Sequence, residues 1–218
     1  MEEKEYESVK VSGANVQSGT NYKDIKVAGA SKFVNDIVCN TFKASGAVKS
    51  EGSIKANFFS TTGALKIGGT LDAKEIKAAG GITIGKDVVC ESAKMSGSIT
   101  IKGKVSAKEF FVDGEIKVGD ELLADKFELK LNGESELQEV YGDEISITKE
   151  FSFGFRQHRS CTATLIEATT IELEGTQCKK VSGDHVKIGE GCVIDLVEYT
   201  TSIDIHKKAK VMEQLKIE

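Results

Sequence analysis

The sequence predicts an all-β protein, a parallel β-helix (solenoid) with about 17 residues in each coil, followed by a smaller β-solenoid segment. Side chains of buried type alternate at period 2, which is the signature of strands. Proline, which removes a donor from a strand ladder, is absent from all 218 residues. The main observation is a glycine that returns after 16 and then repeatedly 17 residues, at Gly13, Gly29, Gly46, Gly63, Gly80, Gly97 and Gly114.

Each repeat contains three short groups of alternating apolar positions. Around Gly63 these positions are Phe59, Thr61, Leu65, Ile67, Leu71 and Ala73. Three short strands joined by bends would form one coil of a triangular β-helix, with equivalent side chains about 4.8 Å apart in successive coils. The glycine suits a bend because it tolerates positive φ. A helical fold is disfavoured because the helical i, i+3, i+4, i+7 spacing is missing and β-branched residues and glycine are frequent.

We expect four segments along the chain. Residues 1–7 form a flexible acidic leader, and residues 8–147 form the β-helix core. Residues 148–162, which contain TKEFSFGFRQHRSCT, break the pattern and read as a connecting hairpin or crossing segment. Residues 163–218 resume the alternation as a second, shorter β-solenoid stack. The sequence leaves open whether the two stacks are separate or form one continuous helix with an insertion.

Composition narrows the class of protein. Aromatic residues make up only 6% of the chain, which fits a narrow core of valine, isoleucine and alanine. The net charge of −5 argues against a nucleic-acid-binding protein. The charge is uneven, because residues 1–126 hold 18 basic and 17 acidic residues whereas residues 127–218 hold 11 and 17.

The cysteines and the N-terminus indicate a cytoplasmic setting. Cys39 and Cys90 occupy the same slot three coils apart, about 14 Å, which is too far for a disulfide. They are therefore interpreted as small buried hydrophobic residues in a reducing compartment. The N-terminus has no apolar signal sequence, and no stretch of 18 apolar residues predicts a transmembrane segment.

Several repeats share a unit of alternating apolar, lysine and small residues around the glycine. Two examples are FKASGAVKSEGSIKAN, residues 42–57, and AKMSGSITIKGKVSAK, residues 93–108. Over residues 9–126, and more weakly over 163–211, the chain resembles the bactofilins, bacterial polymer-forming cytoskeletal proteins. The resemblance implies a right-handed, three-sided β-helix that polymerises through its ends without nucleotide. It also implies a cytoplasmic protein, often held at the inner face of the membrane.

The ends of the solenoid are the predicted assembly interface. A terminal coil exposes unpaired N–H and C=O groups and apolar core, so it is a template for another coil. A repeated end contact without a closing rotation produces a filament. The predicted interface residues are Val9 and Val11 with Ile25 and Val27 behind them, and Ile203, Ile205 and Val211 at the other end.

A second candidate surface is aromatic. Phe151, Phe153 and Phe155 alternate, so a strand would place them on one side, either covering the open side of the solenoid or contacting a partner. The expected function is a self-assembling scaffold that organises cell-envelope machinery, with the chain itself as the main partner and cell-envelope or membrane-associated proteins as further ones. The alternative is a non-polymerising β-helical binding or adaptor module, capped by its C-terminal segment.

Candidate sites for other chemistry are weak, so we expect no catalytic, cofactor-binding or metal-binding residues. The three histidines, His158, His185 and His206, show no metal-binding spacing. The segment 80–86, GGITIGK, departs from a phosphate loop. The coils are too short to wall a groove around an acidic cluster of Asp113, Glu115, Asp120 and Glu121. Two rows of lysines form either a solvated face or a contact for an anionic surface, and they are Lys10, Lys26, Lys43, Lys77 and Lys94, and Lys32, Lys49, Lys66 and Lys117.

Overall fold

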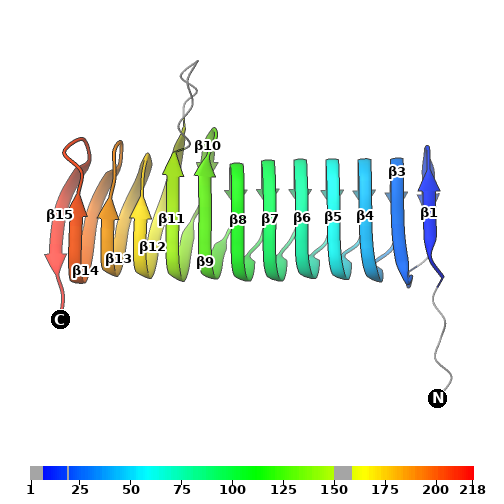
Figure 1. The fold of residues 1–218 in the computed structure, drawn as a ribbon, viewed down its shortest axis with the longest axis horizontal. Helices are drawn as coiled ribbons and strands as arrows, with labels where there is room; N and C mark the ends of the chain where they lie inside the picture. The colour runs from blue at the N-terminus through cyan, green and yellow to red at the C-terminus, as the bar shows by residue number, and fades with distance from the viewer. Residues whose placement is uncertain (1–6, 19, 150–158) are drawn as a thin grey trace.

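The computed structural model describes residues 7–18, 20–149 and 159–218, which form one elongated parallel β-solenoid (Figure 1). It has about 12 turns of about 17 residues, and the described residues contain no helix. The strands are β1 (Val9–Ser12), β2 (Asn15–Gln17), β3 (Asp24–Phe33), β4 (Ile37–Ser50), β5 (Ile54–Ile67), β6 (Leu71–Ile84), β7 (Val88–Ile101), β8 (Val105–Val118), β9 (Glu121–Leu131), β10 (Glu134–Glu136), β11 (Glu139–Lys149), β12 (Ser160–Leu173), β13 (Thr176–Ile188), β14 (Val193–Ile205) and β15 (Lys210–Lys216).

One continuous ladder passes through both predicted stacks. The strands pair in parallel in the order β1-β3-β4-β5-β6-β7-β8-β9-β11-β12-β13-β14-β15, while β2 pairs with β3 and β10 pairs with β8 and β12. The pairing of β11 with β12 joins the core to the C-terminal stack. Of the two arrangements that the sequence left open, the structure therefore has the continuous one. The described edges of the predicted connecting segment belong to the ladder, because β11 extends to Lys149 and β12 begins at Ser160.

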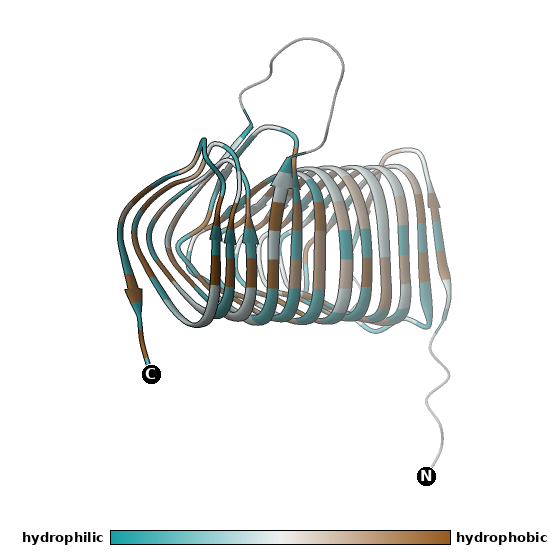
Figure 2. Ribbon diagram, turned by 60° about the vertical axis from the view of Figure 1, so that its left-hand side comes forward, coloured by the Kyte–Doolittle hydropathy of each residue, from teal (hydrophilic) through white to brown (hydrophobic). Residues whose placement is uncertain are grey.

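Alternating side chains build the core as vertical columns. Figure 2 shows hydrophobic positions recurring at the same height from turn to turn. In one column, the rings of Phe42 and Phe59 stack with centroids 5.0 Å apart, and those of Phe110 and Phe127 lie 6.0 Å apart. All four side chains are fully buried. Among the turns, each one therefore packs on the turn before it and the turn after it, as in other solenoids.

The periodic glycines form a column of their own, as the repeat predicts. Gly29 to Gly114 pair in register from turn to turn, with φ between +102° and +145°. A side-chain carbon added at Gly46 would overlap the carbonyl oxygen of Gly29. Glycine is required here both by the backbone conformation and by the close stacking of the bends. After Gly114 the column continues with Leu131 and Lys149, so the constraint ends there.

A second corner is closed by side chains that accept hydrogen bonds from the next turn. The backbone N–H of Ser53 donates to Asp36 Oδ1 at 2.7 Å, and that of Lys104 donates to Asp87 Oδ1 at 2.9 Å. The residue before each donor is a glycine, and a side-chain carbon at Gly103 would overlap the Asp87 carboxylate. These contacts satisfy backbone groups at the bend, where the strand ladder is interrupted.

Candidate functional site

The N-terminal end of the solenoid consists of β1 and β2. Within the described residues these strands pair only with β3, so their other edge has no strand partner. Val9 is half-buried, Val11 is buried and the outward Val16 is 63% exposed. Ile25 and Val27, one turn further in, are buried beneath them. Of the four residues predicted for this end, Val9 and Val11 lie in the terminal turn, and the other two form the layer behind it.

The C-terminal end consists of β15 and the last part of β14. β15 pairs with β14 only as far as Tyr199, and residues 202–205 of β14 pair only with β13 within the described residues. The three residues predicted for this end, Ile203, Ile205 and Val211, are half-buried and pack against the core. Met212 is 65% exposed, which the sequence analysis did not single out. Both ends therefore present open strand edges beside incompletely covered apolar side chains.

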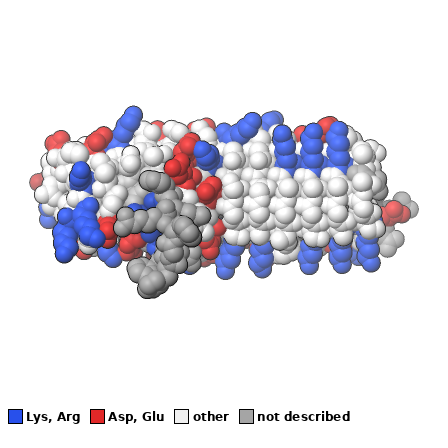
Figure 3. All heavy atoms as spheres, turned by 90° about the horizontal axis from the view of Figure 1, so that it is seen from above, with Lys and Arg blue, Asp and Glu red and all other residues white. Residues whose placement is uncertain are grey.

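The lysine rows border a strip of small residues that runs along the glycine column. Figure 3 shows this strip as a white band with lysines above and below it over the N-terminal half. A shallow groove of about 970 Å³ lies on one side of the column, with Ala30, Ala47 and Ala64 among its lining residues. Lys32, Lys49 and Lys66 also line this groove, and no bulky side chain protrudes between the two rows in this stretch.

Most lysines of the strip lack an acidic partner within the described part of the chain. Lys32 pairs with Glu51 at 2.7 Å, which lowers the pKa of that carboxyl group, and Lys77 pairs with Glu75 at 2.7 Å. Lys43 lies over an aromatic ring instead. Within the residues described, no ion pair involves Lys10, Lys26, Lys49, Lys66 or Lys94.

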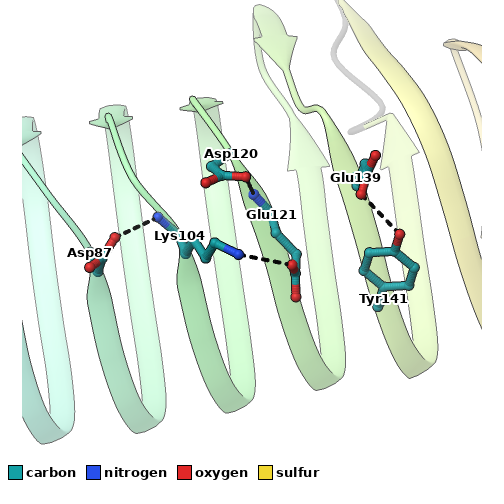
Figure 4. A network of polar contacts seen from close by, with 6 residues as sticks. All are labelled: Asp87, Lys104, Asp120, Glu121, Glu139 and Tyr141. Atoms are coloured by element: carbon teal, nitrogen blue, oxygen red, sulfur yellow. Dashed lines mark hydrogen bonds and ion pairs between the residues drawn. The ribbon is translucent and has the colours of Figure 1, made fainter.

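The acidic cluster predicted around the seventh repeat is not one site. Asp113 and Glu115 flank Gly114 within β8, whereas Asp120 and Glu121 lie at the next bend. At that bend Glu121 accepts a contact from Lys104 Nζ at 3.2 Å, and its backbone N–H donates to Asp120 Oδ1 at 3.0 Å (Figure 4). The pair raises the pKa of the Lys104 ammonium. The four carboxylates therefore lie in two places instead of forming one acid–base pair, and Glu121 links its turn to the preceding one through Lys104.

The five cysteine thiols are free, as the spacing of the repeat predicts for Cys39 and Cys90. Cys39 shares a column with Ala56, Ala73 and Cys90, as the repeat predicts. Burial raises the pKa of the Cys39 and Cys90 thiols to about 12, far above neutral pH. Such thiols are not ionised at neutral pH, so they act as packing residues instead of nucleophiles.

Histidines contribute surface hydrogen bonds in the described part of the chain. His185 Nδ1 lies 2.9 Å from Ser202 Oγ, and His206 Nδ1 accepts from the backbone N–H of Lys208 at 3.3 Å. His185, Ser202 and His206 are all exposed. Among the described residues, no group of three or more His, Cys, Asp or Glu side chains is placed to hold a metal ion. The described residues also include no helix that is long and apolar enough to span a membrane.

The aromatic candidates Phe151, Phe153 and Phe155 lie outside the described residues, as does His158. Their expected role as a cover or a partner contact therefore stays a prediction.

Comparison with known proteins gives one partial likeness. The chain is 31% identical over 83 residues to the uncharacterized protein YhbF of Bacillus subtilis (strain 168). The match covers 38% of this chain and 35% of YhbF, so it spans about a third of that protein. No family model matches the sequence, and no solved structure matches the chain.

Proposed function

We propose that this chain is a structural scaffold protein that assembles end to end, without nucleotide, in the manner of the bactofilins that its repeats resemble. The observation that carries the proposal is the pair of open ends. Within the described residues, β1 and β2 at one end and β14 and β15 at the other leave strand edges unpaired. Open parallel edges beside apolar side chains are templates for further strands.

The energetics favour contact between ends over contact between sides. Val9, Ile203, Ile205 and Val211 are only half-buried, and completing their burial would contribute about 1 kcal/mol for each side chain. The outward faces of the rod carry lysines and carboxylates instead, which oppose lateral pairing of strands. Because the two ends point in opposite directions along a rod, repeated end contacts extend a filament and do not close a ring.

Negative-stain electron microscopy at physiological salt, with no nucleotide added, tests the proposal. We expect filaments from the native chain and shorter ones from Ile205→Asp, which places a charge at the C-terminal edge. Val89→Asp is the matched control, because Val89 is a 43% exposed valine in the middle of the rod. Uniform single particles from the native chain at all concentrations would contradict end-to-end assembly.

Organisation of cell-envelope machinery is the role we propose for such a filament, in keeping with the resemblance. A non-enzymatic, cytoplasmic protein with no bound cofactor is part of the same proposal. Its test in cells is a fluorescent fusion expressed in bacteria. Extended structures along the envelope would support the role, and Ile205→Asp should disperse them.

The second candidate function is a non-polymerising binding module, and the lysine-bordered strip favours it. Lys26, Lys49 and Lys66 have no ion pair among the described residues and flank a smooth floor of small side chains. This arrangement suits the acidic lipid headgroups of a membrane surface, to which each nearby lysine contributes about 1 kcal/mol.

Co-sedimentation with phosphatidylserine-containing vesicles tests this second candidate. We expect K26E/K49E/K66E to abolish binding that the native chain shows at low salt. The control K74E/K86E/K102E changes three exposed lysines outside the strip by the same charge. Equal loss of binding in both variants would show that net charge governs binding and would contradict a specific role for the strip.

A further inference from the structure

One side of the rod carries a charge gradient along its length. This charged face is formed by residues 58–62 of β5 and by the residues that pair with them in the other turns. Its central outward column contributes one residue from each turn between β1 and β14. In order along the rod, these residues are Lys10, Lys26, Lys43, Ser60, Lys77, Lys94, Phe111, Glu128, Ser146, Glu172, Lys187 and Asp204. The first half of the column is therefore basic, and the second half is mainly acidic.

This column is nearly complementary to itself when it is read in opposite directions. If two copies of the face meet with their rods antiparallel, the first position of one copy faces the last position of the other. Lys43 then faces Glu172 of the second copy, and the remaining facing pairs are Lys10 with Asp204, Ser60 with Ser146, Lys77 with Glu128, and Lys94 with Phe111. Opposite charges thus face each other at three of the six kinds of position.

One like-charged pair remains in the antiparallel arrangement, between Lys26 and Lys187. Lys187 is already neutralised within its own chain, because its Nζ lies 2.7 Å from Glu172 Oε1. Lys26 has no ion pair within the described residues. The same Glu172 therefore lies between Lys187 of its own chain and the lysines of the second copy, so the mismatch falls beside a carboxylate.

The neighbouring outward column of the charged face supports the same arrangement. Its members from the second turn onward are Asp24, Thr41, Phe58, Glu75, Ser92, Glu109, Lys126, Glu144, Thr170, His185 and Ser202. In the antiparallel arrangement Asp24 faces His185, and Glu75 faces Lys126. No two like charges face each other among these members.

Exposed aromatic rings also gather on this face. Phe58 and Phe111 are only half-buried, whereas Phe59 and Phe110 beside them point inward and are fully buried. Lys94 Nζ lies 5.7 Å from the centre of the Phe111 ring. A hollow of about 450 Å³ at the middle of the column is lined by Lys94, Phe111 and Glu128. Aromatic side chains are enriched at protein interfaces, and this hollow lies where the centre of an antiparallel pair would be.

We propose that two copies of this chain pack side by side and antiparallel through the charged face, related by a two-fold axis between β7 and β8. The same patch then serves both copies, as in other two-fold pairs. The inference goes beyond the proposed end-to-end assembly, because it concerns a side of the rod and joins no strand edges. The face is about 55 Å long and about 17 Å wide from the spacing of turns and residues, so each copy buries about 900 Å², which is typical of stable interfaces.

A parallel pair would be repelled by the same charges. With the rods parallel and in register, each residue of the central column faces its own copy, so five lysines of the first half face five lysines. Like charges across an interface oppose association and exclude the wrong arrangement. Each exposed ion pair contributes little by itself, so the charges select the orientation while the buried area and the aromatic rings hold the pair together.

Cross-linking between two separately prepared variants tests the orientation. Ser60 and Ser146 face each other in the proposed pair, and neither carries charge, so S60C and S146C leave the gradient intact. We expect S60C, carrying a mass tag, to link to S146C through a bismaleimide with a spacer of about 10 Å, the separation of packed sheet faces. Neither variant should link alone. S106C replaces S146C as the matched control, because Ser106 is exposed in a column with Val89 and Leu123 on another face. The native chain measures the background from its own cysteines.

Each outcome separates this pairing from assembly through the ends. A link between S60C and S146C with none to S106C supports the antiparallel pair, even in a chain that forms no filaments. Links between two S60C chains would show parallel pairing and overturn the proposal. Filaments without the S60C–S146C link would overturn it as well, while leaving end-to-end assembly intact.

Charge reversal in two different chains provides a second test. K43E/K77E makes the first half of the column acidic, and E128K/E172K makes the second half basic, so like charges meet when either variant pairs with itself. We expect each to raise the dissociation constant of the pair about tenfold, measured from the S60C–S146C link at increasing protein concentration. A mixture of the two variants restores opposite charges and should pair like the native chain.

The control for this test is K86E/K102E, which reverses two exposed lysines at the bends before β7 and β8. It should leave the dissociation constant unchanged. A mixture that pairs as weakly as its separate components would contradict the proposed facing of the two halves.

Discussion

The N-terminal and C-terminal halves of the solenoid share one ladder but keep different periods. From β3 to β8 paired residues are always 17 positions apart in the sequence. At the bend that contains Gly29 in β3, every one of these turns has a glycine. From Phe127 onward the paired column runs through Ile145, Ile171, Val186 and Ile203, so the steps are 18, 26, 15 and 17 residues. The second half nonetheless stacks in the same parallel manner.

The comparison separates two features of the sequence: the inward apolar columns, which both halves have, and the glycine column, which only the regular half has. Inward columns stay mainly apolar through both halves, with a few buried hydroxyl groups such as those of Thr61 and Thr176. Phe127, Ile145 and Ile171 are as well buried as Phe59. The glycine column, by contrast, stops after Gly114. Alternating burial is therefore sufficient for stacking, whereas glycine is a local requirement of the tightly stacked bend.

The largest expected effect on stability comes from truncating one buried side chain of an inward column in each half. Phe59→Ala and Ile171→Ala each remove a buried side chain, and we expect losses of about 3–5 and 2–5 kcal/mol in the free energy of unfolding. Chemical denaturation followed by circular dichroism measures both. Val89→Ala, on the outer surface, should change little. An unchanged free energy of unfolding in Ile171→Ala would show that packing within the inward columns does not stabilise the C-terminal half.

The next effect concerns the glycine bend. Gly80→Ala places a side chain at φ +117° and against the carbonyl oxygen of Gly63, so we expect a loss of about 1–3 kcal/mol. The adjacent Gly81→Ala is the control, because nothing lies within 4 Å of its added carbon. Thermal unfolding of the two variants separates strain at the bend from a general effect of removing glycine. Equal melting temperatures would break the proposed distinction.

A smaller effect is expected at the corner closed by aspartate. Asp87→Ala removes the acceptor for the backbone N–H of Lys104, which we expect to cost about 0.5–1.5 kcal/mol. Asp87→Asn retains an oxygen acceptor and should keep most of the stability. Denaturant midpoints of the two variants give the comparison. Identical losses would assign the effect to the negative charge instead of the hydrogen bond.

The smallest effect is a pH dependence shared by both halves. The Lys32 hydrogen bond lowers the pKa of Glu51 below 4.5, and the Lys208 hydrogen bond does the same for Glu190. The stability that each pair contributes is thus present above pH 4.5 and is lost as the pH falls through the lowered pKa. The melting temperatures of E51Q and E190Q should lie slightly below that of the native chain at neutral pH and converge with it in acid. A difference that grows in acid would contradict this sign.

Sequence periodicity predicted the regular half in detail but not how the halves join. The regular spacing of glycines located the bends at Gly46 and Gly63, because positive φ and the close approach of the neighbouring turn there require glycine. The step of 26 residues between Ile145 and Ile171 contains the segment that breaks the register, so counting could not place residues on either side of it in one column.

The sequence predicted which residues lie at each end of the solenoid, but not how the residues of the two ends are related. Apolar alternation identified Val9 and Ile203 as terminal residues, and the structure places both at open edges. Val9 and Ile203 share one column, and Lys10 shares another with Asp204. These relations depend on the pairing register of every turn in between, so the spacing of residues within one repeat could not predict them. Grouping Asp113 with Asp120 was wrong in space, because a bend of the coil separates residues that are close in sequence.

The direction of the ladder has a mechanical consequence. Strands run around the rod, so their hydrogen bonds run along its axis, and a stretching force on a filament would load all the bonds of one interface between turns together. A force applied to a single strand at one end would instead peel the coil one turn at a time. Such a rod resists tension spread over its cross-section and yields to a pull on its chain ends.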